Sequence, residues 1–172
     1  IKRIDDVLKS EVVRVFDQKS INDEIEWFHS RSTSLENLIR YLHGVISSRP
    51  LPGGVSVTGI RLEEMPTLWA EWDGQDPMVT ITRTYEFAAA HRLHSPFISQ
   101  EQNDAIYGKC NNAAGHGHNY VLEVSIAGVP DERTGMIADI GALDRVVDEA
   151  VVNRYDHKNL NEDIEEFRGR IT

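Results

Sequence analysis

The most informative stretch of the sequence runs from Gly108 to Tyr120 and reads Gly108-Lys109-Cys110-Asn111-Asn112-Ala113-Ala114-Gly115-His116-Gly117-His118-Asn119-Tyr120. In an extended strand, residues two apart point to the same side, so His116 and His118 can present two imidazoles to one metal ion. His91, at the end of another expected strand, can supply a third. Three histidines leave a tetrahedral zinc with one open position, which is typical of catalytic sites. Cys110, shortly before His116, places a thiol close to them.

The composition is that of an ordinary globular protein. Of the 172 residues, 40% are hydrophobic and 27% are charged, enough for one core or parts of two smaller ones. Cys110 is the only cysteine, which excludes an intrachain disulfide and favours a reducing cytoplasm. No apolar run approaches the length of a membrane span. The net charge of −10 argues against a nucleic-acid or membrane partner, but a metal and local cations could still hold a small anionic substrate.

The carboxyl end of the chain repeats its amino end. Residues 1–33 align without a gap on residues 140–172, with 13 of 33 positions identical, whereas chance would give about two. The repeat predicts the back half of a first copy in residues 1–75 and the front half of a second copy in residues 76–172. Two arrangements remain open, a piece of a longer tandem protein and a natural permutation. The tandem piece is favoured, because Thr172 ends the chain where the first copy continues into a helix. The chain opens on Ile1 rather than Met, so we expect the natural amino terminus to lie upstream.

The spacing of apolar residues predicts helices and strands in alternation. Helices are expected at residues 5–16, from a capping box formed by Thr33 and Glu36 onward, and at about 141–154. Strands are expected at residues 55–64, 67–72, 78–90 and 119–127, with a turn at 131–135. Residues 92–115 are expected to form a long polar loop. Strand pairs with helices on one face indicate an α+β sandwich.

Several motifs resemble those of the 6-pyruvoyl-tetrahydropterin synthase family. They are Phe87–Leu93, Gly108–Tyr120, Thr134–Met136 and Asp156–Leu160 in the second copy, and Ser34–Asn37 and Ile60–Glu64 in the first. The likeness covers nearly the whole chain in permuted order. It implies a T-fold, in which an antiparallel four-stranded sheet carries two helices on one face. In such a fold several units join their sheets into a barrel, so the resemblance also implies a homo-oligomer with active sites at subunit interfaces.

The resemblance further implies a role for individual residues. The Zn²⁺ ligands would be His91, His116 and His118, and the catalytic thiol would be Cys110. The aspartate–histidine pair that works with the thiol would be Asp156 and His157. The carboxylate that anchors the pterin ring would be Glu64.

The implied substrate is a pterin triphosphate, 7,8-dihydroneopterin triphosphate, which the family converts to 6-pyruvoyl-tetrahydropterin with elimination of triphosphate. Zinc would act as a Lewis acid on the side-chain hydroxyls, and the Cys110 thiolate would remove a carbon-bound proton. His157 would move protons near neutral pH. A buried Glu64 would accept two N–H bonds from the ring. Arg92 and Lys109 are candidate contacts of the triphosphate.

Some residues depart from the family pattern and keep other functions open. Gln18 stands where the second copy has His157, and glutamine cannot titrate. A ring built from such copies could alternate competent and incompetent sites, or the chain could be a catalytically silent zinc-binding ring subunit. A nearer alternative is 6-carboxy-tetrahydropterin synthase, which serves deazapurine (queuosine) biosynthesis and releases acetaldehyde from the same substrate. The five residues between Cys110 and His116 favour the pyruvoyl reaction, since that relative typically has a shorter gap.

Overall fold

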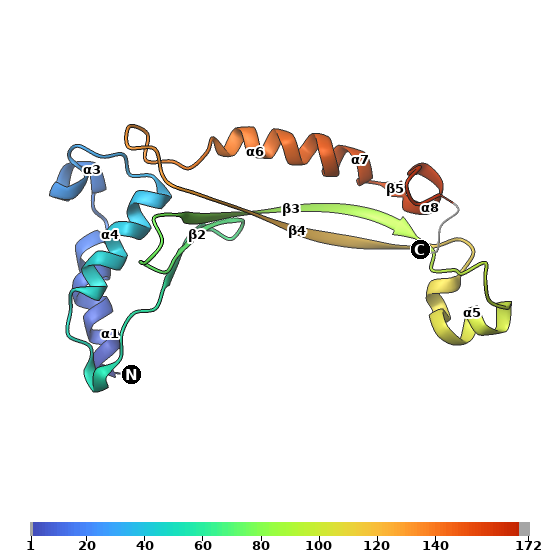
Figure 1. Ribbon diagram of the computed structural model, residues 1–172, viewed down its shortest axis with the longest axis horizontal. Helices are drawn as coiled ribbons and strands as arrows, with labels where there is room; N and C mark the ends of the chain where they lie inside the picture. Colours follow the sequence, from blue (N-terminus) through green and yellow to red (C-terminus); the bar gives the residue numbers. More distant parts are fainter. Residues whose placement is uncertain (1, 169–172) are drawn as a thin grey trace. The chain divides into compact units, whose positions relative to one another are not determined.

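The computed structural model describes residues 2–168 of the chain (Figure 1). The chain divides into two compact units, each described here by itself. Unit 1 comprises Ile1–Arg83 and Val124–Asp139, and unit 2 comprises Thr84–Glu123 and Ile140–Thr172. The outermost positions of the repeat, Ile1 and residues 169–172, lie outside the described residues.

A mainly antiparallel sheet forms the framework. Its strands within residues 2–168 are β1 (Ile60–Met65), β2 (Leu68–Trp72), β3 (Val79–His91), β4 (His116–Gly128) and β5 (Lys158–Asn159). The order is β1-β2-β3-β4, and the short β5 pairs in parallel with β3. The expected four-stranded α+β sheet is therefore confirmed, and the two long strands lie within a few residues of their predicted bounds.

The sequence predicts that this strand starts at Val55, but β1 begins at Ile60. It pairs with β2 from Ile60 opposite Trp72 to Met65 opposite Leu68, with an irregularity in register between Glu63 and Met65. Because β2 ends at Trp72, the residues before Ile60 face no strand with which to continue the ladder.

The helix α4 (Leu35–Ser47) covers the β1–β2 hairpin in unit 1 (Figure 1). Its buried face carries Leu35, Ile39 and Leu42 at helical spacing, as predicted. Ile39 is fully buried, as are Ala70 of β2 and Val79 of β3, and Ile81 of β3 is almost completely buried. The other helical segments of unit 1 are α1 (Lys2–Leu8), a π-helical turn at Lys9–Val13, α2 (Arg14–Phe16), α3 (Ile21–Glu24), and the 3-10 turns Glu26–Phe28 and Pro52–Gly54.

The predicted capping box at the start of α4 is wrong. The N-cap is Ser34, whose side chain accepts the N–H of Asn37, and not Thr33. Glu36 is buried, and its carboxylate accepts the N–H of Ile137 from a loop far along the chain. A capping box would require the Glu36 side chain to accept the N–H of the N-cap residue. The Glu36 carboxylate accepts the N–H of Ile137 instead.

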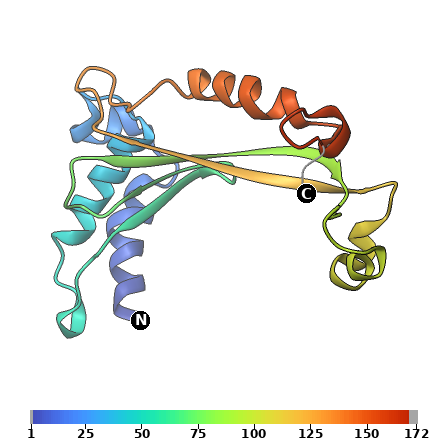
Figure 2. The same ribbon diagram turned by 45° about the vertical axis from the view of Figure 1, so that its right-hand side comes forward.

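In unit 2, α6 (Ile140–Val147), a π-helical turn at Asp148–Val152 and α7 (Asn153–Tyr155) form one helical segment. Figure 2 shows this segment running alongside β3 and β4. The phenol of Tyr85 donates a 2.9 Å hydrogen bond to Asp144 of α6, and the ring of Phe87 lies against those of Tyr120 and Tyr155. The segment ends in a corner that contains β5 and α8 (Leu160–Asp163). No helix among the described residues is long and apolar enough to cross a membrane.

The expected polar loop at residues 92–115 instead contains α5 (Gln100–Tyr107) and a 3-10 turn, η4 (Gly108–Asn111). A capping box of Ser99 and Gln102 starts α5. Asn103 is completely buried, and its side chain bonds to Ser95 through both its oxygen and its nitrogen. These side-chain bonds satisfy backbone groups that an irregular loop would leave to water, and they order the segment.

Candidate metal centre and catalytic site

Three histidines meet where strand β3 ends and strand β4 begins. His91 is the last residue of β3, while His116 and His118 are the first and third residues of β4. One nitrogen from each ring can be chosen so that all three lie within 4.8 Å of one another. The ring centroids are 4.7 Å apart for His91 and His116 and 5.2 Å apart for His91 and His118. The structure therefore brings together the three ligands expected from the sequence.

Gly115 allows this approach. Its φ of +72° lies in the region that favours glycine, and a Cβ at this position would stand 3.1 Å from the carbonyl oxygen of His91. The turn into β4 can therefore pass close to the end of β3. This close passage places His116 beside His91.

The electrostatics of the cluster suit a cation. Burial, followed by the neighbouring His116 and His118, lowers the pKa of His91 below its ordinary value, so its imidazole is neutral at pH 7 and keeps a lone pair for a ligand. The Nδ1 atom of His116 is buried and has no hydrogen-bond partner. An orphaned nitrogen of this kind is costly unless something binds it. A divalent metal would satisfy it, and three imidazoles are a donor set that zinc accepts.

Cys110 lies on the turn η4, half-buried and with a free thiol. Its carbonyl oxygen accepts a 2.9 Å hydrogen bond from the N–H of Leu93, two residues beyond His91. This main-chain bond holds the turn that carries Cys110 against the segment that follows His91.

A side-chain network that the sequence did not reveal braces the same turn. Asn111 is buried and accepts from the Arg92 guanidinium through both its backbone and its side-chain oxygen, at 2.9 and 3.0 Å. The side chains of His94 and Asp104 also bond to the Asn111 amide. Arg92, expected as a contact of the triphosphate, therefore braces Asn111, while Lys109 is exposed.

The Asp156–His157 pair lies beside the same end of β3. One carboxylate oxygen of Asp156 accepts the N–H of Ala88 at 2.8 Å, and the other is 2.8 Å from Nδ1 of His157. The bond from Ala88, followed by the bond from His157, holds the pKa of Asp156 below its ordinary value. The His157 backbone has a φ of +58° and donates to the carbonyl of Ala88, while its side chain is 83% exposed.

These groups border an open depression on unit 2. Its lining comes from three stretches, Ala88–Ala90 of β3, Gly117–Asn119 of β4 and His157–Asn159 of the corner. The metal cluster and the aspartate–histidine pair, far apart in sequence, therefore share one region of the surface. Such a region could hold a small polar molecule between the histidine cluster and the imidazole of His157.

Glu64 belongs to the other compact unit, where it is exposed on β1. The expectation of a buried carboxylate is wrong for the isolated chain. The neighbouring Glu63 pairs with Arg61 at 3.2 Å.

The comparisons with known proteins agree with these motifs. The family model described as 6-pyruvoyl tetrahydropterin synthase matches residues 1–75 and 80–172. A 6-pyruvoyl tetrahydrobiopterin synthase of Drosophila melanogaster is 46% identical over 93 residues, which cover 54% of this chain and 55% of the relative. A 6-carboxy-5,6,7,8-tetrahydropterin synthase of Rickettsia conorii is 33% identical over 101 residues, covering 54% of this chain and 64% of that protein. The solved 6-pyruvoyl tetrahydropterin synthase of Caenorhabditis elegans is 43% identical and superposes with a TM-score of 0.52, covering 56% of this chain and 68% of that one.

Proposed function

The chain belongs to the 6-pyruvoyl tetrahydropterin synthase family, and we propose that it carries a zinc-dependent synthase activity that converts 7,8-dihydroneopterin triphosphate into 6-pyruvoyl-tetrahydropterin. The observation that carries the proposal is the convergence of His91, His116 and His118 within 4.8 Å. The chain spans 55% of the length of the Drosophila relative, so the activity, substrate and partners of the whole protein are part of the proposal. We place the activity in the cytoplasm, where the single cysteine would stay reduced.

The metal is assigned to the three histidines. The orphaned Nδ1 of His116 and the lowered pKa of His91 support this assignment. When bound, zinc supplies Lewis-acid chemistry that acidifies the hydroxyl groups of the substrate side chain and the adjacent C–H bonds. The histidines themselves hold the cation and leave one coordination position for the substrate.

Cys110 is assigned to remove a proton from a carbon of the substrate side chain. The turn η4 holds it beside the segment that follows His91, and a thiolate is the reactive form for this task. His157 is assigned to carry protons between the substrate and water. Its Nδ1 is fixed by Asp156, and the ring is exposed, so its other nitrogen is available for transfer.

The hydrogens of this reaction balance within the substrate. Loss of triphosphate and of a side-chain proton gives an enol that becomes one ketone. Oxidation of the remaining side-chain hydroxyl carbon gives the second ketone, and the dihydropterin ring takes up the two hydrogens as it becomes a tetrahydropterin. No outside oxidant or reductant is needed, and the protein only has to move protons.

Glu64 is assigned to the pterin ring, whose amino-pyrimidinone edge offers two N–H donors to a carboxylate. Glu64 is exposed in the single chain. We therefore propose that association of several copies encloses it, and that the active sites form at interfaces of a homo-oligomer. This association would also occupy the free edges of β1 and β4, the outer strands of the sheet.

The test is product analysis of the purified chain with 7,8-dihydroneopterin triphosphate. We expect triphosphate and 6-pyruvoyl-tetrahydropterin by mass spectrometry. Release of acetaldehyde and 6-carboxy-tetrahydropterin would instead assign the reaction named for the Rickettsia relative.

A Cys110→Ala variant tests the catalytic reading against a silent zinc-binding subunit. We expect it to keep one zinc and its fold while losing turnover by at least about 100-fold, the lower range for a general base. A wild-type chain that binds zinc, assembles and shows no turnover would establish the silent subunit.

A further inference from the structure

The two copies of the repeat have the same local structure. Each begins with an α-helix that continues through a π-helical turn, at Lys9–Val13 and at Asp148–Val152, into a further helical turn. Each then bends at a residue with a φ of +58°, Gln18 in the first and His157 in the second. A four-residue helix follows in both. Residues 5–22 are called the first segment and residues 144–161 the second segment.

The second segment is docked on β3 by three side chains. Asp144 accepts the hydroxyl of Tyr85 at 2.9 Å, and Asp156 accepts the N–H of Ala88 at 2.8 Å. Asn161 brackets the backbone of Arg92, accepting its N–H at 2.7 Å and donating to its carbonyl at 3.2 Å. Between the first two contacts, Val147 is buried, with 6% of its surface exposed.

The first segment carries the same three polar residues, Asp5, Asp17 and Asn22, and all three are exposed. Leu8 stands at the position of Val147, but 37% of its surface is exposed. Lys19 and Ser20, which match the β5 residues Lys158 and Asn159, belong to no strand. The first segment therefore has the same docking groups, but no strand within residues 2–168 packs against them.

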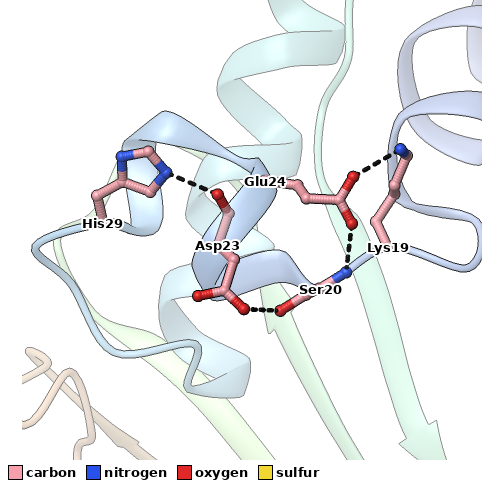
Figure 3. Close-up of polar contacts among 5 residues, drawn as sticks. All are labelled: Lys19, Ser20, Asp23, Glu24 and His29. Atoms are coloured by element: carbon pink, nitrogen blue, oxygen red, sulfur yellow. Dashed lines mark hydrogen bonds and ion pairs between the residues drawn. The ribbon is translucent and has the colours of Figure 1, made fainter.

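The corner of the first segment is nevertheless already shaped (Figure 3). The N–H of Ser20 donates to Glu24 at 3.0 Å, just as the N–H of Asn159 donates to Asp163 at 2.8 Å. Glu24 also pairs with Lys19 at 2.6 Å, and Asp23 accepts from the Ser20 hydroxyl. A pre-shaped surface loses little conformational entropy when a partner binds.

We propose that the first segment is a docking surface for an extended strand that has the recognition pattern of β3. That pattern is a tyrosine at the position of Tyr85, a main-chain N–H at the position of Ala88 that points at the docking segment, small residues beside it, and the backbone of Arg92 at its end. The tyrosine hydroxyl would bind Asp5, the N–H would bind Asp17, and the last backbone pair would bind Asn22. This inference concerns binding alone and stands apart from the proposed activity.

The strand comes from a polypeptide segment other than these 172 residues. Each chain has a single β3, and its own second segment already binds Tyr85, Ala88 and Arg92. A second copy of the chain could lend its β3 only by vacating its own docking groups, so exchange between copies gains no contacts.

The experiment titrates the full chain into a fluorescein-labelled peptide that comprises residues 79–92, followed by anisotropy. We expect saturable binding of one peptide per chain. Asp17→Ala should weaken it about tenfold or more, since a hydrogen bond to a charged group is lost. Asn22→Ala should weaken binding by a smaller factor, and a peptide with Tyr85→Phe should bind about threefold or more weakly. Asp6→Ala, an exposed neighbour on α1, is the matched control and should bind as the unaltered chain does.

Three results would overturn the proposal. Absence of saturable binding would remove the docking surface. Equal binding by the Asp17→Ala, Asn22→Ala and unaltered chains would place the peptide elsewhere, for instance on an open sheet edge. Dimerisation that Asp17→Ala abolishes and the peptide displaces, measured by sedimentation, would make a second copy the source of the strand. Circular dichroism of each variant checks that the fold is retained.

Discussion

Ala88 lies three residues before His91, a proposed metal ligand, and its main-chain N–H donates a 2.8 Å hydrogen bond to the carboxylate of Asp156. This bond connects the corner that carries His157 to the strand that carries His91. The lowered pKa of Asp156, due first to Ala88 and then to His157, gives the connection a pH dependence.

Acid should weaken this connection. The pKa of Asp156 is lower in the folded chain than in the unfolded chain, so its stabilisation is present above an ordinary aspartate pKa of about 3.9. It is lost as the pH falls through the folded value. We expect Asp156→Asn to lower the midpoint of urea unfolding at pH 7 and to have little effect near pH 2. Asp6→Asn serves as the exposed control, and an equal effect of Asp156→Asn at both pH values would contradict the argument.

Removing one histidine should release the metal. We expect His118→Ala to lower zinc affinity by more than about 100-fold, since loss of a supporting partner alone costs about 10- to 100-fold. Competition with a chromophoric chelator measures this affinity, and His29→Ala is the matched control outside the cluster. Because the pKa of His91 is lowered, protons should compete with zinc for this ring only at a pH below the ordinary range of histidine. Equal zinc affinity in the two variants would place the metal elsewhere.

Gly115→Ala should disturb the metal centre through the backbone. The new Cβ would require a φ of +72° and would approach the carbonyl of His91 to 3.1 Å. We expect a loss of about 1 kcal/mol or more in unfolding free energy, together with weaker zinc binding. Gly117→Ala is the comparison, because its Cβ would meet only the Ala89 carbonyl, at 4.0 Å. A Gly115→Ala chain as stable as the Gly117→Ala chain would show that the turn can relax.

Asn111→Ala should loosen the turn that carries Cys110. The substitution leaves Arg92, His94 and Asp104 without a shared partner, which should cost about 1–3 kcal/mol of stability. Alkylation of Cys110 by iodoacetamide should become faster, since the turn opens more often. Asn119→Ala, at an exposed position on β4, should leave both measurements unchanged. Unaltered alkylation in Asn111→Ala would mean that the Leu93 contact suffices.

His157→Gln should remove the proton carrier without altering the corner. Gln18 already occupies the equivalent position of the repeat with the same φ of +58°. We expect zinc content and thermal stability to stay close to those of the unaltered chain while turnover falls by about 100-fold or more. A chain that keeps its turnover would assign the proton transfer to another group.

Much of the site could be read from the sequence because its information is local. The spacing of two between His116 and His118 fixes a common side of a strand, and the alternation in residues 78–90 predicts a strand that ends at His91. The joint role of Asp156 and His157 was implied by the family resemblance. The docking of this pair on Ala88 could not be predicted in the same way, because it depends on the path of the intervening chain.

The errors arise where tertiary contacts override local patterns. Thr33 and Glu36 have capping-box spacing, but Glu36 binds Ile137 instead. The capping box of Ser99 and Gln102 could have predicted the start of helix α5. The polar composition of residues 92–115 favoured a loop instead. The bracing of Asn111 by Arg92 had no such signal. The expected burial of Glu64 failed because this residue is exposed on β1.

The position of the histidines at a strand junction has a consequence for folding. A slip of β4 by a single residue against β3 would turn both His116 and His118 to the opposite side of the sheet. A misaligned chain would then be unable to retain a cation. Zinc content, measured on refolded protein, would therefore distinguish molecules with the correct β3–β4 register from molecules in which β4 is shifted by one residue.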